Sequence, residues 1–585
     1  MTRVRPAAAL VLRDLARALS LSTLCHILVW RVLLDNTSNW PRRSTCWAVL
    51  INDLLLAAIF FAGITLARRS RSALAMTAAR WAFVLVLIIP LNGIINSEYS
   101  ARGMSSALAH VDTRAVLSAG AALVSLTALV ALRNRHMALR VLVAVAATAP
   151  LLVVRHSQRL LVQGVLLVVG ALAFWRWNQR AIRAAAAIVL LLSPFTLFTF
   201  AQTAAYLTQF KDKPPAPRLS TDAATARHLV WIIFDELDYR LAFVERPASL
   251  ALSELDRLRG EALETTHAYP PANYSLMSIP AMITGRLIAR VRVVNPSELM
   301  ITYGDSKEPV PWSQQGNVFA AARRLGVNSA VVGWFNPYCR VIGDSIADCT
   351  YEDFGGMTLW KSMGKQARGV MKTIPFSRKL GLARVGHDTR SDRGERVVRY
   401  NVMLEAARRT LQDPALGLIL LHWPVPHPPG IYSRAKDTFE VKGESSYIDN
   451  LLLVDHAVGD IRRAMEAAGT WDRTTVLVSS DHWWRHELWR QEGGLTAEEL
   501  QFATEIDHRV PFILKLAGQH EAVTYAPAFN TVLVHDLILA ILGGEVRSSG
   551  DAAAWIDQHR SIGESPYSTG VTSGRREPIR SPAGL

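Results

Sequence analysis

The chain has 585 residues, of which 50% are hydrophobic, and its formal net charge is +15. This length exceeds what one globular core needs, and the mean hydropathy of +0.17 excludes a wholly soluble protein. A basic chain can indicate nucleic-acid binding. Here the arginine-rich segments beside apolar runs explain the charge more simply, so we expect no nucleic-acid partner.

Apolar runs long enough to cross a hydrocarbon core of about 30 Å fill the first two hundred residues. They predict a polytopic α-helical membrane domain over 1–206 with about seven spans. The first span contains Arg31, and the fifth and sixth are short enough to shift or fuse. Asp53 lies inside the second span, where lining a polar cavity and pairing with a nearby arginine are both compatible with the sequence. The expected spans lie near 18–34, 46–67, 77–96, 115–132, 138–154, 160–175 and 184–206.

Positive charge sets the expected orientation of these spans. With a cytoplasmic N-terminus, arginine clusters within 3–17, 68–71, 133–135 and 176–183 all fall in cytoplasmic segments, and the opposite loops carry fewer. The positive-inside rule then places everything after residue 207 outside the cytoplasm. Export would allow Cys339 and Cys349, ten residues apart, to form a disulfide, although two free thiols fit the sequence equally well.

The exported part begins with a linker over 207–227, where prolines and lysines disfavour helix and strand. Over 228–545, short β-rich runs then alternate with amphipathic helical stretches, which indicates an α/β domain with a largely parallel sheet. Residues 546–585 form a C-terminal extension that we expect to be partly disordered. The expected strands are His228–Phe234, Ser329–Trp334, Gly417–Leu421, Thr474–Val478 and Val510–Lys515, and the expected helices include Asn317–Leu325 and Tyr447–Ala467.

Three of the expected strands end in side chains that bind metals or move protons. In parallel sheets such groups meet at one edge, beyond the carboxyl ends of the strands. Each has an ordinary alternative, because an aspartate can cap the next helix and a histidine can be a hydrogen-bonded structural residue. Agreement among three strands favours a site, and its carboxylates with one imidazole suit Zn²⁺ or Mn²⁺. The residues are Asp235, Glu236, His422, His427, Asp481 and His482.

A possible nucleophile lies in Asn273–Gly285, where Ser275 and Ser278 precede an apolar helical stretch. A hydroxyl near a helix N-terminus can share the backbone N–H groups that also hold an anionic phosphate. The ordinary alternative is that Ser278 caps a helix entered through Pro280 and that Ser275 lies in a plain loop.

Several motifs follow one another along the chain in a definite order. They are a strand ending in Asp-Glu, Ser275 followed by Gly285, a His-Trp-Pro-Val-Pro-His run, Ser-Asp-His and Arg-Val-Pro-Phe. In this order they resemble the alkaline phosphatase and sulfatase superfamily over about 228–545. The resemblance is to its membrane-bound lipid A phosphoethanolamine transferases and lipoteichoic acid synthases. It implies an alkaline-phosphatase-like α/β fold behind a polytopic membrane domain.

The resemblance also assigns roles to individual residues. The nucleophile lies ten residues before the glycine and five before the proline, and both counts give Ser275, which would also bind the metal. Departures from the family pattern are serine in place of threonine, Trp483 in place of glycine, and no clear downstream histidine, for which His486 is a candidate. The implied metal ligands are Asp235, Glu236, Asp481 and His482. His427 matches the histidine that contacts the transferred phosphoryl group, and His422 occupies a flanking catalytic position.

The resemblance implies a divalent metal, Zn²⁺ first and Mn²⁺ or Ca²⁺ as alternatives, and transfer of phosphoethanolamine or phosphoglycerol through a phosphoserine. The donor would be a phospholipid and the acceptor an envelope glycan or lipid, at the bacterial inner membrane with the catalytic domain periplasmic. A membrane-anchored phosphodiesterase or phosphatase, and a non-catalytic scaffold, are the alternatives. Sulfate hydrolysis through formylglycine is not expected, because the residues after Ser275 lack the proline and arginine of that signature.

Overall fold

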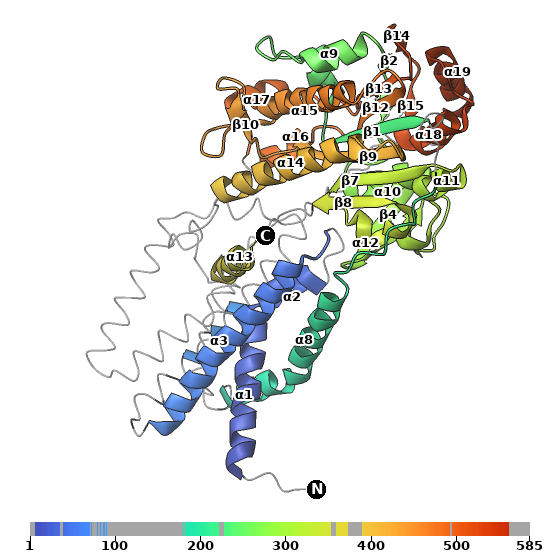
Figure 1. Cartoon of the computed structure of the whole chain (residues 1–585). Coiled ribbons are helices and arrows are strands. Elements are labelled where there is room, and N and C mark those ends of the chain that lie inside the picture. The colour runs from blue at the N-terminus through green and yellow to red at the C-terminus, as the bar shows by residue number, and fades with distance from the viewer. Residues whose placement is uncertain are drawn as a thin grey trace.

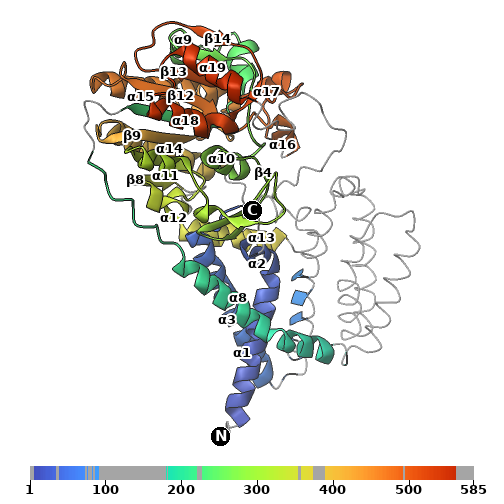
Figure 2. The same cartoon turned by 90° about the vertical axis from the view of Figure 1, so that its right-hand side faces the viewer.

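The computed structural model describes residues 6–34, 39–70, 180, 182–220, 227–352, 358–372, 389–491 and 494–560, with isolated positions between 72 and 90. Apolar helices at the N-terminus lie below an α/β domain (Figures 1 and 2). This arrangement confirms the predicted fold class of apolar N-terminal helices followed by an α/β domain.

The described N-terminal part contains two helices long and apolar enough to cross a membrane, Arg43–Arg69 and Ile182–Thr208. The first predicted span is instead a bent pair, which begins earlier in the chain and turns by 69° near His26, and which makes a third candidate if counted as one span. The predicted spans at 115–132, 138–154 and 160–175 lie outside the described residues. The labelled helices here are α1 (Pro6–Cys25), α2 (Ile27–Leu34), α3 (Arg43–Arg69) and α8 (Ser193–Thr208).

An eight-stranded sheet forms the centre of the α/β domain, with strand order β14-β2-β13-β12-β1-β9-β7-β8. The strands from β12 to β8 run parallel, whereas β13 pairs antiparallel with both of its neighbours. Every strand that the sequence predicted is present. The sheet contains β1 (His228–Asp235), β2 (Leu263–Thr265), β7 (Asn328–Trp334), β8 (Asp348–Glu352), β9 (Leu416–Pro426), β12 (Thr474–Ser480), β13 (Phe512–Lys515) and β14 (Val523–Tyr525).

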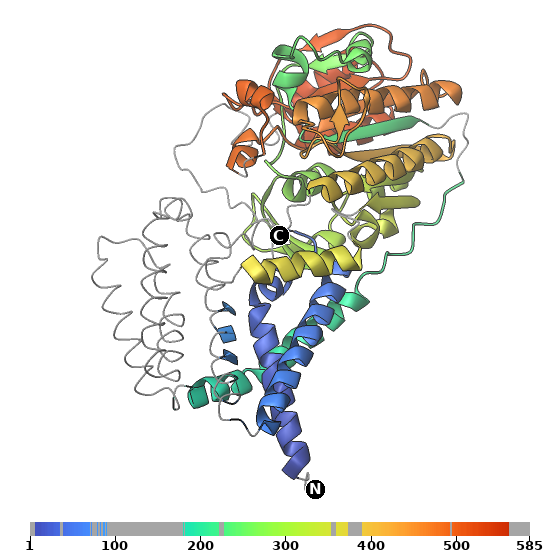
Figure 3. The ribbon, with the colours of Figure 1, turned by 90° about the vertical axis from the view of Figure 1, so that its left-hand side faces the viewer.

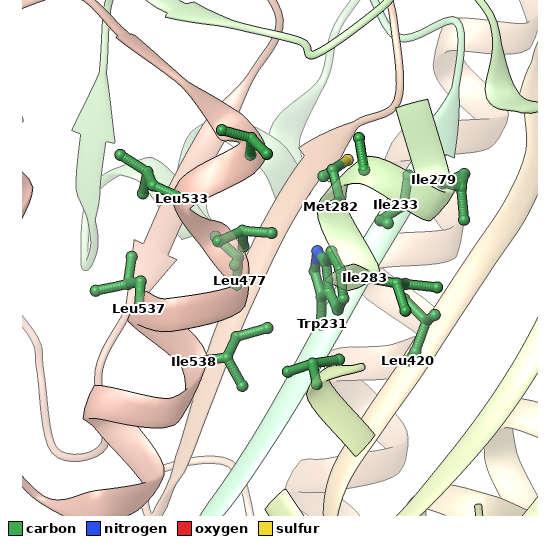
Figure 4. Close-up of a cluster of buried hydrophobic side chains, with 14 of the residues drawn as sticks. Trp231, Ile233, Ile279, Met282, Ile283, Leu420, Leu477, Leu533, Leu537 and Ile538 are labelled. Atoms are coloured by element: carbon green, nitrogen blue, oxygen red, sulfur yellow. The ribbon is translucent and has the colours of Figure 1, made fainter. Parts of the chain in front are cut away.

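Alternate residues of β1 face two different cores, as the two-residue period of a strand requires. Trp231 and Ile233 pack against one layer of helices, where they meet Ile279, Met282 and Ile283 (Figure 4). The residues between them pack against the other layer. The first layer contains α10 (Ser275–Thr284), α11 (Val318–Arg324), α18 (Val534–Gly543) and α19 (Ser549–His559), and the second contains α9 (Ser253–Arg259), α14 (Thr389–Leu411) and α15 (Tyr447–Ala467).

Smaller elements complete the domain. They are the strands β3 (Ala268–Tyr269), β4 (Ile288–Asn295), β5 (Glu298–Tyr303), β6 (Val310–Pro311), β10 (Tyr432–Ser433), β11 (Thr438–Phe439) and β15 (Phe529–Asn530). The remaining helices are α12 (Tyr338–Val341), α13 (Leu359–Lys372), α16 (His486–Gln491) and α17 (Ala497–Phe502), and short turns lie at Arg240–Val244, Trp312–Gln314, Gly343–Ser345 and Thr531–Leu533. A disulfide joins Cys339 in α12 to Cys349 in the edge strand β8, which settles the alternative left open by the sequence.

Helix α13 lies between the α/β domain and the apolar helices (Figure 3). It packs along α3, where the Asn52 amide donates to the Met363 carbonyl at 3.0 Å and the Gln366 amide donates to the Thr45 carbonyl at 2.9 Å. On the other side, the Tyr206 hydroxyl of α8 donates to the Val294 carbonyl at 3.0 Å. The α/β domain is thus attached to the apolar helices by polar contacts as well as by the chain itself.

Candidate active site

Two neighbouring parallel strands bring the central cluster of side chains together. Strand β1 ends at Asp235, and the next strand, β12, is followed at once by Asp481 and His482. The His482 Nε2 atom lies 3.5 Å from an oxygen of Asp235 and 3.5 Å from an oxygen of Asp481. All three side chains are buried, and their potential ligand atoms lie within 4.8 Å of one another.

Each of these side chains has one atom engaged and one atom free. The Trp334 indole donates to Asp235 Oδ2 at 2.6 Å, the Asp481 Oδ1 atom accepts from two backbone amides, and the His482 Nδ1 atom donates to the Trp483 carbonyl. Among the described residues, Asp235 Oδ1, Asp481 Oδ2 and His482 Nε2 have no hydrogen-bond partner. Buried polar atoms without partners are costly, so three that converge fit a bound divalent metal.

The electrostatics of the cluster agree with this fit. Burial raises the pKa of Asp481 to about 7, and burial together with the charge of Asp481 raises the pKa of Asp235 well above its ordinary value. Burial and the charge of Arg485 hold the pKa of His482 well below its usual range. The His482 imidazole is therefore neutral at pH 7, and the neutral imidazole is the form that binds metals. The two carboxyl groups, whose pKa values are raised, would be ionised fully by a nearby cation.

Glu236 lies outside this cluster, although the resemblance made it the ligand after the first strand. Its backbone has a φ of 71°, and its carboxylate accepts from Arg485 Nε at 2.6 Å and from the Trp489 indole at 3.1 Å. The structure brings the preceding residue, Asp235, to the cluster instead. Metal binding by Glu236 stays a prediction, and it would require the ion pair with Arg485 to break.

Ser275 is the first residue of α10, and its hydroxyl lies close enough to the Asp481 carboxyl group to lower the pKa of that group. It therefore lies beside the cluster and at the end of a helix, where backbone N–H groups face an incoming anion. Ser278 does not cap the helix, because it lies inside α10, whose N-cap residue is Tyr274; its buried hydroxyl instead donates to the Asp481 carbonyl at 2.6 Å. Gly285 ends α10 in a left-handed conformation, at a φ of 69°.

The two histidines of β9 and its extension differ in their surroundings. The His427 amide donates to the Asp235 carbonyl at 3.0 Å, and its Nδ1 atom lies 2.6 Å from the Pro428 carbonyl and 3.3 Å from Arg396 Nη2. Burial and the charge of Arg396 lower the pKa of His427 well below its ordinary value. His422 is fully buried, and its Nδ1 atom lies 2.8 Å from the Tyr338 hydroxyl.

Several neighbours of the cluster were not found from the sequence. Arg485 follows the Asp-His pair by three residues, so its nearness in sequence was a usable signal. Arg396 reaches His427 from α14, and Trp334 reaches Asp235 from β7, with no motif to mark either one. The suggested stand-in His486 does not join the cluster, because its Nε2 atom lies 3.1 Å from the Glu505 carbonyl.

The family model described as Sulfatase matches residues 227–543, which is more than half of the chain. The chain belongs to the sulfatase family. Its sulfatase-family domain therefore marks it as an enzyme of the alkaline phosphatase superfamily, attached to apolar helices that indicate a membrane protein. No curated protein sequence matches the chain significantly.

Several solved structures are similar to this chain at low sequence identity. The lipoteichoic acid synthase LtaP from Listeria monocytogenes is 13% identical, with a TM-score of 0.36, and the match covers 57% of this chain and 77% of that one. A phosphonate monoester hydrolase of Agrobacterium radiobacter is 14% identical, with a TM-score of 0.35 over 54% and 74%. A Bacteroides thetaiotaomicron sulfatase of glycosaminoglycan metabolism is 12% identical, with a TM-score of 0.37 over 59% and 83%. These scores are low, so the family assignment rests on the sequence match.

Proposed function

We propose that this protein is a metal-dependent membrane phosphotransferase. It would move a phospho-alcohol head group, phosphoethanolamine or phosphoglycerol, from a phospholipid to an envelope glycan or lipid. One observation carries the proposal: Ser275 begins α10 beside a buried cluster whose three unpaired ligand atoms fit a divalent metal. The resemblance to phosphoethanolamine transferases and lipoteichoic acid synthases names the reaction, and the apolar helices supply the membrane.

The first step uses Ser275 as the nucleophile. Asp235, Asp481 and His482 would hold a divalent metal, which we expect to be Zn²⁺ and which would act as a Lewis acid that lowers the pKa of a neighbouring hydroxyl. Ser275 then forms a bond to phosphorus, and the bond from phosphorus to the glyceride oxygen breaks. The glyceride leaves with a proton and the head group stays on the serine. The first-turn N–H groups of α10 face the negative charge of the phosphoryl oxygens.

The second step returns the serine. An acceptor hydroxyl attacks the phosphoserine, its proton passes to a base, and the bond between phosphorus and the serine oxygen breaks. His427 suits the role of base, because its lowered pKa leaves the imidazole neutral, with a lone pair on one ring nitrogen, at neutral pH. We assign His422 a structural role beside the site, since its buried ring is hydrogen-bonded to the Tyr338 hydroxyl.

The attachment of the domain to the apolar helices supports a lipid donor. Helix α13 packs on α3, and α8 contacts the β4 strand of the domain, so the domain is held against the apolar helices. We place the domain on the periplasmic side of a bacterial inner membrane. The disulfide supports this side, because disulfides persist in oxidising compartments.

The test is to incubate the purified full-length protein with a phospholipid labelled in its head group, with and without candidate glycan or lipid acceptors. Transfer predicts labelled acceptor and free diglyceride, and both should disappear in the Ser275→Ala variant. Release of label into water at the same rate with or without acceptor would instead establish the hydrolase. Full transfer by the Ser275→Ala variant would contradict the proposed nucleophile.

A further inference from the structure

We propose that Arg485 acts as the second cation of the site, so that the protein binds one metal ion and holds the phosphoryl oxygens between that ion and a guanidinium. This inference deepens the proposed function and relies on it for the identity of the substrate. The inference makes two claims, one metal per chain and an anion site at Arg485. Both can be measured without a phospholipid donor or an acceptor.

The first observation concerns Glu236, which would otherwise offer a carboxylate to a second metal. The carboxylate is buried and accepts four hydrogen bonds, from Arg485 Nε at 2.6 Å, from the Arg485 amide at 3.3 Å, and from the Trp489 indole at 3.2 and 3.1 Å to its two oxygens. A carboxylate with these donors has little left to give a cation. The neighbouring Asp235 faces the other way, toward the unpaired atoms of the cluster.

The backbone fixes this division between adjacent carboxylates. Glu236 has a left-handed φ of 71°, which is uncommon outside glycine and persists only when surrounding contacts hold it. The conformation is held by the Tyr447 hydroxyl, which donates to the Glu236 carbonyl at 2.8 Å, and by the Asp481 carboxylate, which accepts from the Glu236 amide at 3.1 Å. The two acidic side chains are therefore directed to two different cations, a metal and Arg485.

The second observation concerns the remainder of the Arg485 side chain. Its Nε atom is bound to Glu236, but neither Nη group has a hydrogen-bond partner among the described residues, and 22% of the side chain is exposed. The guanidinium is close enough to affect the charges of Asp481, His427 and His482. It thus lies beside the proposed metal with donors unused, which is the arrangement that binds phosphoryl oxygens.

Charge balance favours the same conclusion. Asp235, Glu236 and Asp481 are three carboxylates that are almost fully buried in one place. One divalent ion together with the Arg485 guanidinium neutralises them, whereas a second divalent ion would displace the guanidinium from its carboxylate. Buried charges are tolerated when they are paired, so the described residues fit a site with one metal and one arginine.

The experiment measures metal content and orthophosphate binding on the full-length protein in detergent. Metal is counted by mass spectrometry after dialysis against Zn²⁺, and inorganic phosphate is titrated by calorimetry. The wild type should hold one metal per chain and bind phosphate. Arg485→Met should keep one metal and lose at least about tenfold in phosphate affinity, because it removes the charged hydrogen bonds from the guanidinium to the phosphate oxygens.

Two further variants keep the result interpretable if Arg485→Met fails to fold. The double variant Arg485→Met with Glu236→Gln removes the orphaned buried charge and should show the same loss of phosphate affinity. Arg485→Lys keeps a cation but loses the planar fork of donors, so its affinity should fall between the wild type and Arg485→Met. The matched control is Arg462→Met, which breaks another buried arginine pair, with Glu261, and should leave phosphate affinity unchanged.

Two metals per wild-type chain, no phosphate binding by the wild type, or equal phosphate affinity in Arg485→Met would each overturn the inference. Failure of the proposed function is a separate result. If the wild type holds one metal and binds phosphate through Arg485 but transfers no head group, the proposed reaction is wrong and the assignment of Arg485 stands.

Discussion

The disulfide between Cys339 and Cys349 closes a loop with a sequence separation of 10 residues. It holds α12 against β8, and α12 carries Tyr338, whose hydroxyl contacts His422. Replacing both cysteines by serine returns the loop entropy to the unfolded chain. For a loop of this size the free energy of unfolding should fall by about 2.7 kcal/mol. In a domain of roughly 300 residues this lowers the melting temperature by about 4 °C.

The assay is thermal unfolding of the detergent-solubilised full chain, followed by circular dichroism with and without a reductant. Reductant should lower the melting temperature of the wild type to that of the double serine variant and should leave the variant unchanged. The buried free cysteines Cys25 and Cys46 provide the control, because serine at either position should not remove the response to reductant. Equal melting temperatures for wild type and double variant would refute the reasoning.

The same bond reports on the side of the membrane. If the domain is exported, alkylation of free thiols in intact cells should leave Cys339 and Cys349 unmodified until a reductant is added. A pair that is fully reduced in cells would contradict the periplasmic placement and the assignment of arginine-rich loops to the cytoplasm.

Three further outcomes follow from the geometry of the site. Chelation should abolish activity and lower the melting temperature. Readdition of Zn²⁺ to about a hundredfold above its dissociation constant should raise the free energy of unfolding again by about 2.7 kcal/mol. An unchanged melting temperature would exclude a bound metal. Trp334→Phe removes the hydrogen bond that orients Asp235 and should weaken metal binding about tenfold by competition with a fluorescent chelator, whereas unchanged affinity would show that the indole does not orient the ligand. Because burial and Arg396 hold the pKa of His427 well below its ordinary value, the base form persists as pH falls, so the rate should show no acid limb near pH 6.5; a limb there that disappears in His427→Gln would contradict the neutral imidazole.

The fold was predictable because its strands carry strong local signals. The runs that became β1 and β9 are mostly apolar, β12 has an apolar centre at 476–478, and all three lead into polar residues, as buried parallel strands do. The convergence of Asp235, Asp481 and His482 follows from that pattern, since parallel neighbours end at the same edge. The bend near His26 was not predictable from hydropathy, because an apolar run does not show where a helix breaks.

The sequence could not predict that Asp235 joins the cluster while Glu236 pairs with Arg485. The directions of these two adjacent side chains depend on the backbone φ, which the surrounding contacts impose. The left-handed backbone of Glu236 depends on Tyr447, which is two hundred residues away in sequence. Arg396 is similar, since it reaches His427 from a helix that carries no motif. Contacts of this kind come from tertiary packing, which one sequence does not display.

The central claim is that Ser275 carries the head group between donor and acceptor. Mass spectrometry of the purified protein, incubated with phospholipid in the absence of acceptor and then digested, tests it most directly. The account predicts a phospho-alcohol adduct on the peptide that contains Ser275, which is lost when acceptor is added and is absent from Ser275→Ala. Transfer that proceeds with no adduct at Ser275, or with the adduct on another residue, would contradict it.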